Sequence, residues 1–444
     1  MKKKIILPIV IVAIIVVAAV VLMTACSAPP EMVSRTKKIA RKEAVTEVFF
    51  QSSENEIGTS ENITSQWRGD NRDGIYNETG LLKKWAADGP ELLWFRDELG
   101  DGYSSPAIAN GKIYVTGLYA DDLVLSIFDL NGKLLTRRVV GKEWNGSYPG
   151  ARSTINVNDG KLYIYSSLGQ LHCLDEETLN LIWKKDILND FDGKNLTWGM
   201  TESPLIVDDK VFITPGGKTY NFVALNKHTG ELIWHSAGEG TLSAYCSPQY
   251  IGGYENPIVV TSVEKYIIAF NAETGEKLWS YPQTNRHDIH PNTPIYSDGT
   301  IFSTTGYGNG SMLLRLKTGG KSVEQIWNNN ADNQMGGAVK IGDYVYTSGH
   351  RNRGFYCIDW RTGEIKYKEN QISPSAIIAA DGMLYVYSER GEMALVEPNP
   401  DRFELVSSFS VTLGTNQHWA HPVILDGVLY IRHGDVLMAY KVKI

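Results

Sequence analysis

The chain has few cysteines, and no two of them are adjacent. Its 444 residues contain four, at Cys26, Cys173, Cys246 and Cys357. The three that follow Cys26 are an odd number for pairing. Cys173 and Cys357 also occupy equivalent positions of a repeat whose copies belong on opposite sides of a ring, too far apart for a disulfide. We therefore expect buried free thiols.

Other chemical signatures are missing as well. The sequence shows no Ser-His-Asp arrangement and no set of Cys and His residues at metal-ligand spacing. Gly306-Tyr-Gly-Asn-Gly310 is rich in glycine but opens no helix, so it is predicted to be an exposed loop rather than a phosphate-binding loop. The formal net charge is −7 and no basic stripe is present, which argues against a nucleic-acid partner.

A repeat is present instead. Ala224-Leu-Asn-Lys-His-Thr-Gly-Glu-Leu-Ile-Trp234 returns as Ala269-Phe-Asn-Ala-Glu-Thr-Gly-Glu-Lys-Leu-Trp279, and looser copies begin at Cys173, Leu316 and Cys357. Each copy is predicted to be a strand, a tight turn and a second strand, because Asn or Asp bonds to its own backbone and Gly accepts a positive φ. A spacing of about 45 residues without helical periodicity is typical of a β-propeller.

The number of blades follows from a second element of the repeat, a hairpin such as Ser105-Pro-Ala-Ile-Ala-Asn-Gly-Lys-Ile-Tyr114, of which eight copies are found. The last copy lacks an outer strand, and Leu92 to Phe95 is a strand without a partner. We predict an all-β fold, an eight-bladed β-propeller of four-stranded antiparallel blades, closed by that N-terminal strand. The aromatic residues predicted to wedge between blades are Trp183, Trp234, Trp279, Trp327 and Tyr367.

The N-terminus is predicted to be an export signal or an anchor. Three lysines precede an apolar run from Ile5 to Leu22, and small residues lead to Cys26. This pattern resembles a bacterial lipoprotein signal in which Cys26 is lipidated; the alternative is an uncleaved anchor. Residues 1–26 are assigned to this segment, 27–65 to a tether and 66–444 to the propeller. Either alternative places the propeller outside the cytoplasm, in the cell envelope.

The repeat, together with Trp67-Arg-Gly-Asp-Asn-Arg-Asp-Gly74, resembles the PQQ-binding-like β-propeller repeat proteins of the quinoprotein alcohol dehydrogenase-like superfamily. The resemblance covers residues 66 to 443. Other branches include PQQ-dependent dehydrogenases and the propeller lipoprotein of the outer-membrane protein assembly complex. The fold does not choose between an enzyme and a binding protein.

A site is expected in the central channel, because residues just before each innermost strand face it. These residues are Tyr103, Ser104, Arg152, Ser153, Trp198, Glu202, Ser203, Tyr245, Cys246, His290, Asn292, Met335, Ser373, Trp419 and His421. The ligand-binding candidates among them are Tyr103, Arg152, Trp198, Glu202, Tyr245, His290, Asn292, Trp419 and His421. Catalytic residues remain unassigned.

Two functions fit this channel. The favoured one is a membrane-tethered binding or scaffold module without a cofactor, whose partner is an envelope protein or a small molecule. The alternative is a quinoprotein oxidoreductase with PQQ and Ca²⁺ in the channel. There, Trp198 or Trp419 would stack on the quinone, Arg152 would pair with a carboxylate, Glu202 and Asn292 would hold the cation, and His290 or His421 would act as base. The resemblance to the alcohol dehydrogenase branch implies a pair of adjacent cysteines beside the cofactor. This chain has no adjacent cysteines, which argues against the alternative.

Overall fold

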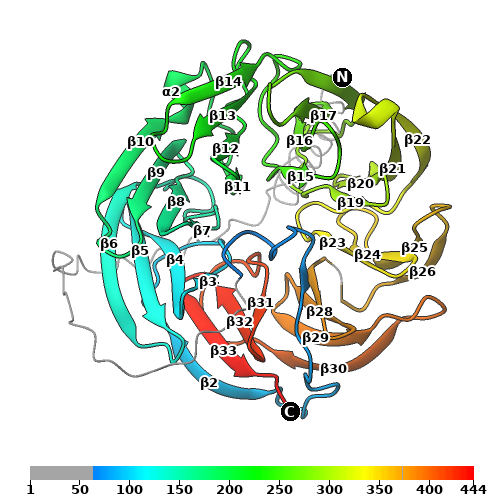
Figure 1. Cartoon of the computed structure of the whole chain (residues 1–444). Helices are drawn as coiled ribbons and strands as arrows, with labels where there is room; N and C mark the ends of the chain where they lie inside the picture. The colour runs from blue at the N-terminus through cyan, green and yellow to red at the C-terminus, as the bar shows by residue number, and fades with distance from the viewer. Residues whose placement is uncertain (1–63, 373) are drawn as a thin grey trace, which may run out of the picture. The chain divides into compact units, whose positions relative to one another are not determined.

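The structure is a computed structural model that describes residues 64–372 and 374–444. The predicted signal, Cys26, residues 27–63 of the tether and Ser373 lie outside these ranges. None of the helices within the described ranges has the length and apolar character of a membrane span. The described residues form a ring of blades around a central channel (Figure 1).

The ring contains eight blades, as predicted, and each blade is an antiparallel sheet that runs from the channel outwards. Blades 1 and 2 consist of β3 (Ala107–Ala109), β4 (Lys112–Tyr119), β5 (Asp122–Asp129) and β6 (Leu134–Lys142), then β7 (Asn156–Asn158), β8 (Lys161–Tyr165), β9 (Gln170–Asp175) and β10 (Leu181–Asp186). Blades 3 and 4 consist of β11 (Leu205–Val207), β12 (Lys210–Ile213), β13 (Phe222–Asn226) and β14 (Leu232–Ser236), then β15 (Gln249–Ile251), β16 (Ile258–Val263), β17 (Tyr266–Asn271) and β18 (Lys277–Pro282).

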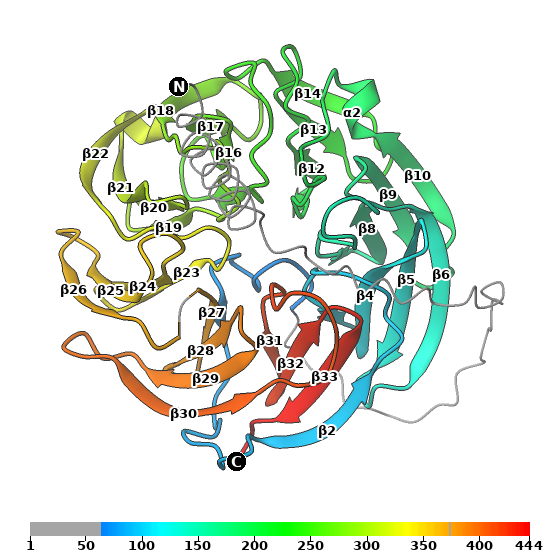
Figure 2. The same cartoon turned by 180° about the vertical axis from the view of Figure 1, so that it is seen from behind.

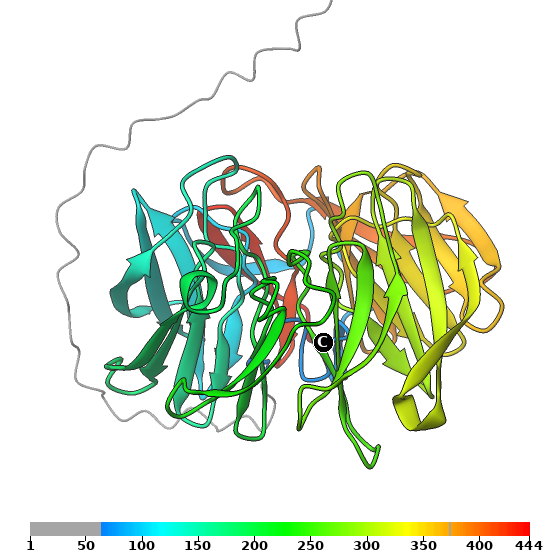
Figure 3. The same ribbon diagram turned by 90° about the horizontal axis from the view of Figure 1, so that it is seen from above.

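The second half of the ring repeats this order. Blades 5 and 6 consist of β19 (Ile295–Ser297), β20 (Thr300–Thr305), β21 (Gly310–Lys317) and β22 (Ser322–Asn329), then β23 (Ala338–Ile341), β24 (Tyr344–Ser348), β25 (Phe355–Asp359) and β26 (Ile365–Glu369). Blade 7 consists of β27 (Ser375–Ala380), β28 (Met383–Ser388), β29 (Glu392–Glu397) and β30 (Glu404–Ser410). Two short helices, α2 (Ile187–Asp190) and η1 (Thr318–Gly320), lie in connections. Figure 3 shows the ring edge-on.

Blade 8 joins the two ends of the described chain. Its inner strands are β31 (Val423–Leu425), β32 (Val428–His433) and β33 (Val436–Lys441), and its outer strand is β2 (Glu91–Arg96). β2 pairs antiparallel with β33, so that Leu92 lies opposite Tyr440 and Phe95 opposite Met438 (Figure 2). The predicted closure of the ring by an N-terminal strand is confirmed.

The turn chemistry of the repeat is visible in blade 3. The Asn226 side-chain oxygen accepts hydrogen bonds from the backbone N–H groups of His228 and Thr229, at 2.8 and 3.1 Å. Gly230 has a φ of 70°, and the strand register shifts between Ala224 and Leu225. The side-chain bonds satisfy the turn backbone, and the glycine supplies the left-handed residue of a bulged hairpin.

The tryptophan of the repeat joins one blade to the next. The indole N–H of Trp183 in blade 2 donates to the backbone oxygen of Lys227 in the turn of blade 3, at 3.0 Å. Gly230 of that turn lies against the indole of Trp183, and a Cβ on it would come within 2.7 Å of the indole. The same donation to the following blade recurs for Trp94, Trp234, Trp279 and Trp327. Glycine is therefore required at position 230 both by the positive φ and by the close contact with the indole of Trp183.

The wedge position differs in some blades. Blade 6 has Tyr367 there, opposite Cys357. Blade 7 has Ser407, whose hydroxyl accepts a hydrogen bond from the backbone N–H of Trp85 at 3.0 Å. The Trp85 ring lies 5.8 Å from Tyr385 of the same blade, the separation at which Trp234 lies from Phe212 in blade 3. The segment before β2 thus supplies the aromatic ring that blade 7 lacks.

Candidate functional site

A segment that we call the plug, residues 64–76, crosses the channel at the centre of the ring (Figure 1). It ends in β1 (Ile75–Tyr76), which adds a parallel fifth strand to the inner edge of blade 7. The plug contacts every blade by hydrogen bonds, through Ile108, Val157, Ser203, Gln249, Thr293, Ala338, Ala379 and His421. It contains Trp67 to Gly74, the segment that together with the repeat resembles the PQQ-binding-like propeller proteins.

Arg68 fixes the plug against blades 6, 7 and 8. Its guanidinium donates to the backbone oxygens of Ala338 at 2.6 Å and Ile377 at 3.3 Å, and to Nδ1 of His421 at 2.9 Å. It lies between Gly74 and Gly337, where a Cβ would come within 2.4 and 2.1 Å of its nitrogens. Larger residues at these two glycines would displace the guanidinium.

The contact with Arg68 decides the protonation of His421. A guanidinium donates and cannot accept, so Nδ1 of His421 accepts, and the opposite Nε2–H donates to the backbone oxygen of Met335 at 2.9 Å. The ring is therefore neutral, in agreement with burial and the charge of Arg68, which lower the pKa of His421 to about 3. Both ring nitrogens are engaged, and His421 is not placed to act as a base.

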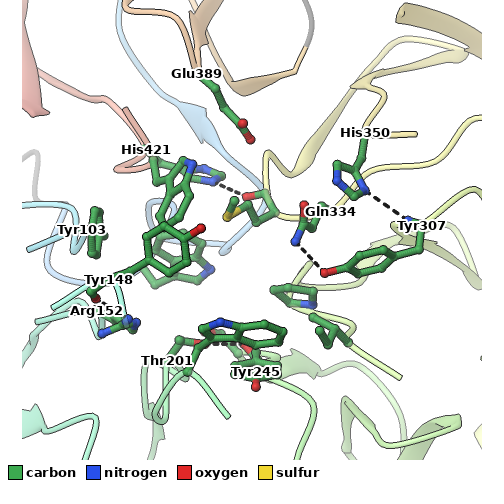
Figure 4. A pocket seen from close by; sticks show the side chains of 17 residues that line it. Tyr103, Tyr148, Arg152, Thr201, Tyr245, Tyr307, Gln334, His350, Glu389 and His421 are labelled. Carbon is green, nitrogen blue, oxygen red and sulfur yellow. Dashed lines mark hydrogen bonds between the residues drawn. The ribbon is translucent and has the colours of Figure 1, made fainter. Parts of the chain in front are cut away.

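A cavity of about 410 Å³ lies at one end of the channel, against the plug (Figure 4). This volume falls within the range of small-molecule sites. Within the described residues, its lining combines seven Trp and Tyr rings with two charged residues, Arg152 and Glu389. The lining residues are Trp67, Tyr103, Tyr148, Arg152, Trp198, Thr201, Tyr245, Ser247, Ile289, Pro291, Tyr307, Gln334, Met335, His350, Glu389, Trp419 and His421.

Six of these seven rings form three groups around the cavity, and the seventh, Trp67, packs against His421 with ring centroids 4.7 Å apart. Trp419 packs against Tyr103 and Tyr148, with ring centroids 5.1 and 5.0 Å apart. Trp198 packs against Tyr245 at 6.2 Å, and Tyr307 meets His350 edge-on at 4.9 Å. A ligand in the cavity would face aromatic surface on several sides.

Three of these tyrosines have an unusual backbone. The φ angles of Tyr148, Tyr245 and Tyr307 are 51°, 70° and 62°. A left-handed backbone costs about 1–2 kcal/mol for a residue with a Cβ, and glycine would avoid that cost. No other Trp, Tyr, Phe or His residue in the described ranges has a positive φ. Strained residues that persist are concentrated at functional sites, so the three tyrosines make the cavity the candidate functional site of this structure.

The two charged residues enter the cavity from different sides (Figure 4). The Arg152 guanidinium donates to the backbone oxygens of Ser147, Tyr148 and Gly150, and its central carbon lies 5.6 Å from the Tyr103 ring centroid. Burial raises the pKa of Glu389, and the Trp419 side chain partly opposes this shift. Burial lowers the pKa of Arg152. Each charge is thus poorly solvated and would gain from an opposite charge on a ligand.

A buried carboxylate holds two walls of the cavity. Asp332 is fully buried and accepts hydrogen bonds from the backbone N–H groups of Gly308, His350, Arg351 and Asn352, at 2.9 to 3.1 Å. These residues belong to the loops that carry Tyr307 and His350. Asp332 is therefore a positioning residue for both side chains.

Six of the nine predicted ligand-binding residues line the cavity: Tyr103, Arg152, Trp198, Tyr245, Trp419 and His421. The other three lie behind its surface. The carboxylate of Glu202 accepts from the backbone N–H and the hydroxyl of Thr214, at 3.1 and 3.2 Å, and burial raises its pKa to about 8. His290 is buried against the Thr305 hydroxyl at 2.8 Å.

Asn292, the third of these, links blades 5 and 6. Its side-chain oxygen accepts from the N–H of Gly337 at 3.0 Å, and its nitrogen donates to the backbone oxygen of Asn333 at 2.8 Å. The two residues predicted to hold Ca²⁺, Glu202 and Asn292, thus have their oxygens engaged within the protein. The described residues contain no group of three or more His, Cys, Asp or Glu side chains that could hold a metal ion. The residues present do not fit PQQ with Ca²⁺ as assigned, and we derive no chemistry through that group.

Sequence reasoning missed several lining residues. Tyr307, His350 and Glu389 lie in loops between the second and third strands of blades 5, 6 and 7, whereas only the segments before the innermost strands were considered. Tyr307 stands in the glycine-rich loop from Gly306 to Gly310, which was predicted to be merely exposed. Trp67 was overlooked because nothing in the sequence places the plug inside the channel.

The repeat, the eight blades and the channel site define a PQQ-like β-propeller. Within that class, the family described as "Outer membrane protein assembly factor BamB" matches residues 124–249 and 223–400, which together exceed half of the chain. The chain therefore belongs to this family.

Individual relatives are more distant. The chain is 24% identical over 266 residues to "Outer membrane protein assembly factor BamB" from Shewanella oneidensis, a match that covers 56% of this chain and 64% of the relative. It is 27% identical over 144 residues to "Quinohemoprotein alcohol dehydrogenase" from Comamonas testosteroni, covering 30% of this chain and 20% of that relative. The chain thus spans less than two thirds of either relative.

Solved structures share the fold. BamB from Moraxella catarrhalis has a TM-score of 0.59 at 14% identity, covering 79% of this chain and 99% of that chain. Quinohemoprotein alcohol dehydrogenase from Comamonas testosteroni has a TM-score of 0.64 at 13% identity, covering 86% of this chain and 80% of that chain. At such identities the likeness concerns the fold and not the activity.

Proposed function

We propose that the protein is a binding and scaffold module of the cell envelope. It is tethered to a membrane through a lipid on Cys26, and it presents the cavity and the loops around it to an envelope protein or a small ligand. An uncleaved N-terminal anchor would serve the same purpose. The envelope location is supported by the basic and apolar N-terminal pattern and by the names of the matching family and of the Shewanella oneidensis relative, both described as outer membrane protein assembly factor.

The observation that carries the binding role is the set of strained tyrosines, Tyr148, Tyr245 and Tyr307. Tyr148 is 37% exposed, so the packing of its ring does not repay the strain of its backbone. A ring kept at such a position is explained by contact with a ligand or partner. The plug supports the same role, because it makes the channel a closed recess rather than a passage.

Photo-crosslinking in the native host tests this proposal. A photoreactive amino acid replaces Tyr148 at the cavity, and a matched control replaces Glu324, which lies on the outer strand β22. We expect a discrete adduct with an envelope component from position 148 and none from position 324. Equal labelling from both positions, or no adduct from position 148, would contradict the proposal.

Membrane attachment has a separate test. Cys26→Ala is expected to leave an unprocessed precursor, because lipidation requires the thiol, while Cys173→Ala should be processed normally. Processing is followed by mass change and by labelling with a fatty acid. Normal processing and labelling of Cys26→Ala would exclude the lipoprotein assignment and leave the uncleaved anchor.

A further inference from the structure

Several hydrogen-bonding groups of the cavity are occupied by the protein itself. The Tyr103 hydroxyl donates to Gln417 at 2.9 Å, and the Tyr307 hydroxyl accepts from Gln334 at 3.0 Å. The Thr201 hydroxyl donates to the backbone oxygen of Tyr245 at 3.0 Å. Both nitrogens of His421 are engaged, as described above. A ligand that requires many hydrogen bonds, such as a sugar, is therefore poorly matched to this lining.

The aromatic surface instead matches a cation without hydrogen-bonding requirements. The faces of Trp and Tyr rings carry negative electrostatic potential and attract ammonium groups, above all methylated ones that are easily desolvated. Three groups of rings, centred on Trp419, Trp198 and Tyr307, border the cavity from different sides. Glu389 reaches into it beside them (Figure 4) and provides an opposite charge.

Arg152 adds a requirement for negative charge. Its guanidinium has five N–H groups, and hydrogen bonds to Gly150, Ser147 and Tyr148 use three of them. A carboxylate or phosphate group can take a remaining N–H and would neutralise the residue. Glu389 and Arg152 enter from different sides, so a ligand complementary to both carries separated charges of opposite sign.

We propose that the cavity binds a small zwitterion that joins a methylated ammonium group to an anionic group, of the betaine or phosphocholine class. The aromatic rings and Glu389 hold the ammonium end, and Arg152 holds the anionic end. This inference rests on the proposed function, because it names the ligand of the same site. The shared chemistry is the charge pair, whether the anionic end is a carboxylate or a phosphate.

Calorimetric titration of the purified protein tests the charge pair with matched probes. The probes are γ-butyrobetaine, phosphocholine, the carbon isostere of γ-butyrobetaine in which a carbon replaces the quaternary nitrogen, and butyltrimethylammonium, which lacks the anionic end. We expect at least one zwitterion to bind about tenfold or more tightly than either single-charge probe, because a desolvated cation–π contact is worth about 2 kcal/mol. The tighter zwitterion identifies the anionic group.

Variants tie the binding of the ammonium group to Glu389 and to the aromatic rings. Glu389→Gln should weaken the zwitterion about tenfold while leaving the carbon isostere unchanged, since the isostere has no cation for Glu389. Tyr148→Gly should also weaken it, without loss of folding, because glycine accepts the φ of 51°. Thermal denaturation of each variant verifies the fold.

The outcomes separate this inference from the proposed function. If neither zwitterion binds, or if the carbon isostere binds as tightly, the zwitterion assignment is overturned. Persistence of the adduct from position 148 would then leave the binding role in place. Loss of both zwitterion binding and the adduct would overturn the two proposals together.

Discussion

The periphery of the ring and the channel are built on different rules. At the periphery the same contact returns from blade to blade, with an indole N–H of one outer strand on the backbone oxygen of the next turn, as for Trp183 and Trp279. Around the channel the equivalent positions carry different residues, such as Tyr103, Arg152 and Trp198. Repetition at the periphery sets the fold, and variation at the channel leaves room for recognition.

The largest effect is expected where the two regions are joined, in the segment that closes the ring. Deletion of residues 85–96 removes β2 and also Trp85, the ring that completes blade 7. We expect loss of the cooperative unfolding transition, because two blades lose their outer contacts at once and net stability is about 5–15 kcal/mol. Circular dichroism on heating and gel filtration measure this.

A substitution in the same strand provides the control for this deletion. Leu93 is 43% exposed, so Leu93→Ser should leave the melting temperature nearly unchanged. An unaltered melting curve for the deletion would contradict closure of the ring by β2.

The second prediction compares a tryptophan from each region. Trp279→Ala removes a wedge that is 7% exposed and its hydrogen bond to Gly320, and should cost about 3–5 kcal/mol. Trp419→Ala in the cavity should cost about 1 kcal/mol, since part of its ring faces the cavity rather than protein. Urea denaturation gives both values. Equal losses would show that the channel rings serve packing as much as the wedges do.

The third prediction concerns Glu202, a channel-side residue that proves structural. Burial raises its pKa from an ordinary 4.5 to about 8. The stability that comes from keeping this carboxyl protonated is complete below about pH 4.5 and is lost as the pH rises through about 8. Glu202→Gln has no such loss, so its stability relative to the wild type should rise with pH, by up to about 1.4 kcal/mol per pH unit.

Melting temperatures of both proteins across this pH window test the assignment. Burial also raises the pKa of Glu143, to about 7, but that residue is present in both proteins and cancels in the difference. A constant difference between pH 5 and pH 8 would mean that Glu202 stays ionised in the folded protein.

The smallest effect on stability is expected at Tyr148, because its ring is 37% exposed and its packing contributes less than the strain of its backbone costs. Tyr148→Gly should change the free energy of unfolding by less than about 1 kcal/mol. Tyr148→Ala keeps the positive φ of 51° and should be about 1 kcal/mol less stable than Tyr148→Gly. If the alanine variant were the more stable one, the backbone at this position would not be strained.

The periphery could be predicted from the sequence because its chemistry is local. Asn226 and Gly230 determine a turn within a few residues, and Asp159-Gly160 or Asp426-Gly427 determine hairpins whose two central φ angles are positive, as observed. Because the same turn and hairpin sequences recur along the chain, each copy supported the assignment of the others. The strand β2 was found as an excess copy of one half of the repeat.

The channel could be predicted in part, because its residues come together across the ring. Segments before the innermost strands gave Tyr103, Arg152 and Trp419, since that position follows from the blade itself. Orientation was not predictable: Asn292 turns toward Gly337 and Asn333, and Glu202 toward Thr214. Contacts between distant segments, such as Arg68 with His421, leave no trace in local periodicity.

The position of the plug also bears on how the chain is made. Arg68 and His421 are 353 residues apart, and β2 awaits the last strand, β33. Because synthesis proceeds from the N-terminus, the plug and β2 are made before the blades and find their last partners only when blade 8 is complete. Until β2 and β33 pair, the edges of both strands stay exposed and can pair wrongly with other strands. A chain truncated before blade 8 would lack His421, one of the groups that hold Arg68 of the plug, and also β33, the strand on which β2 pairs.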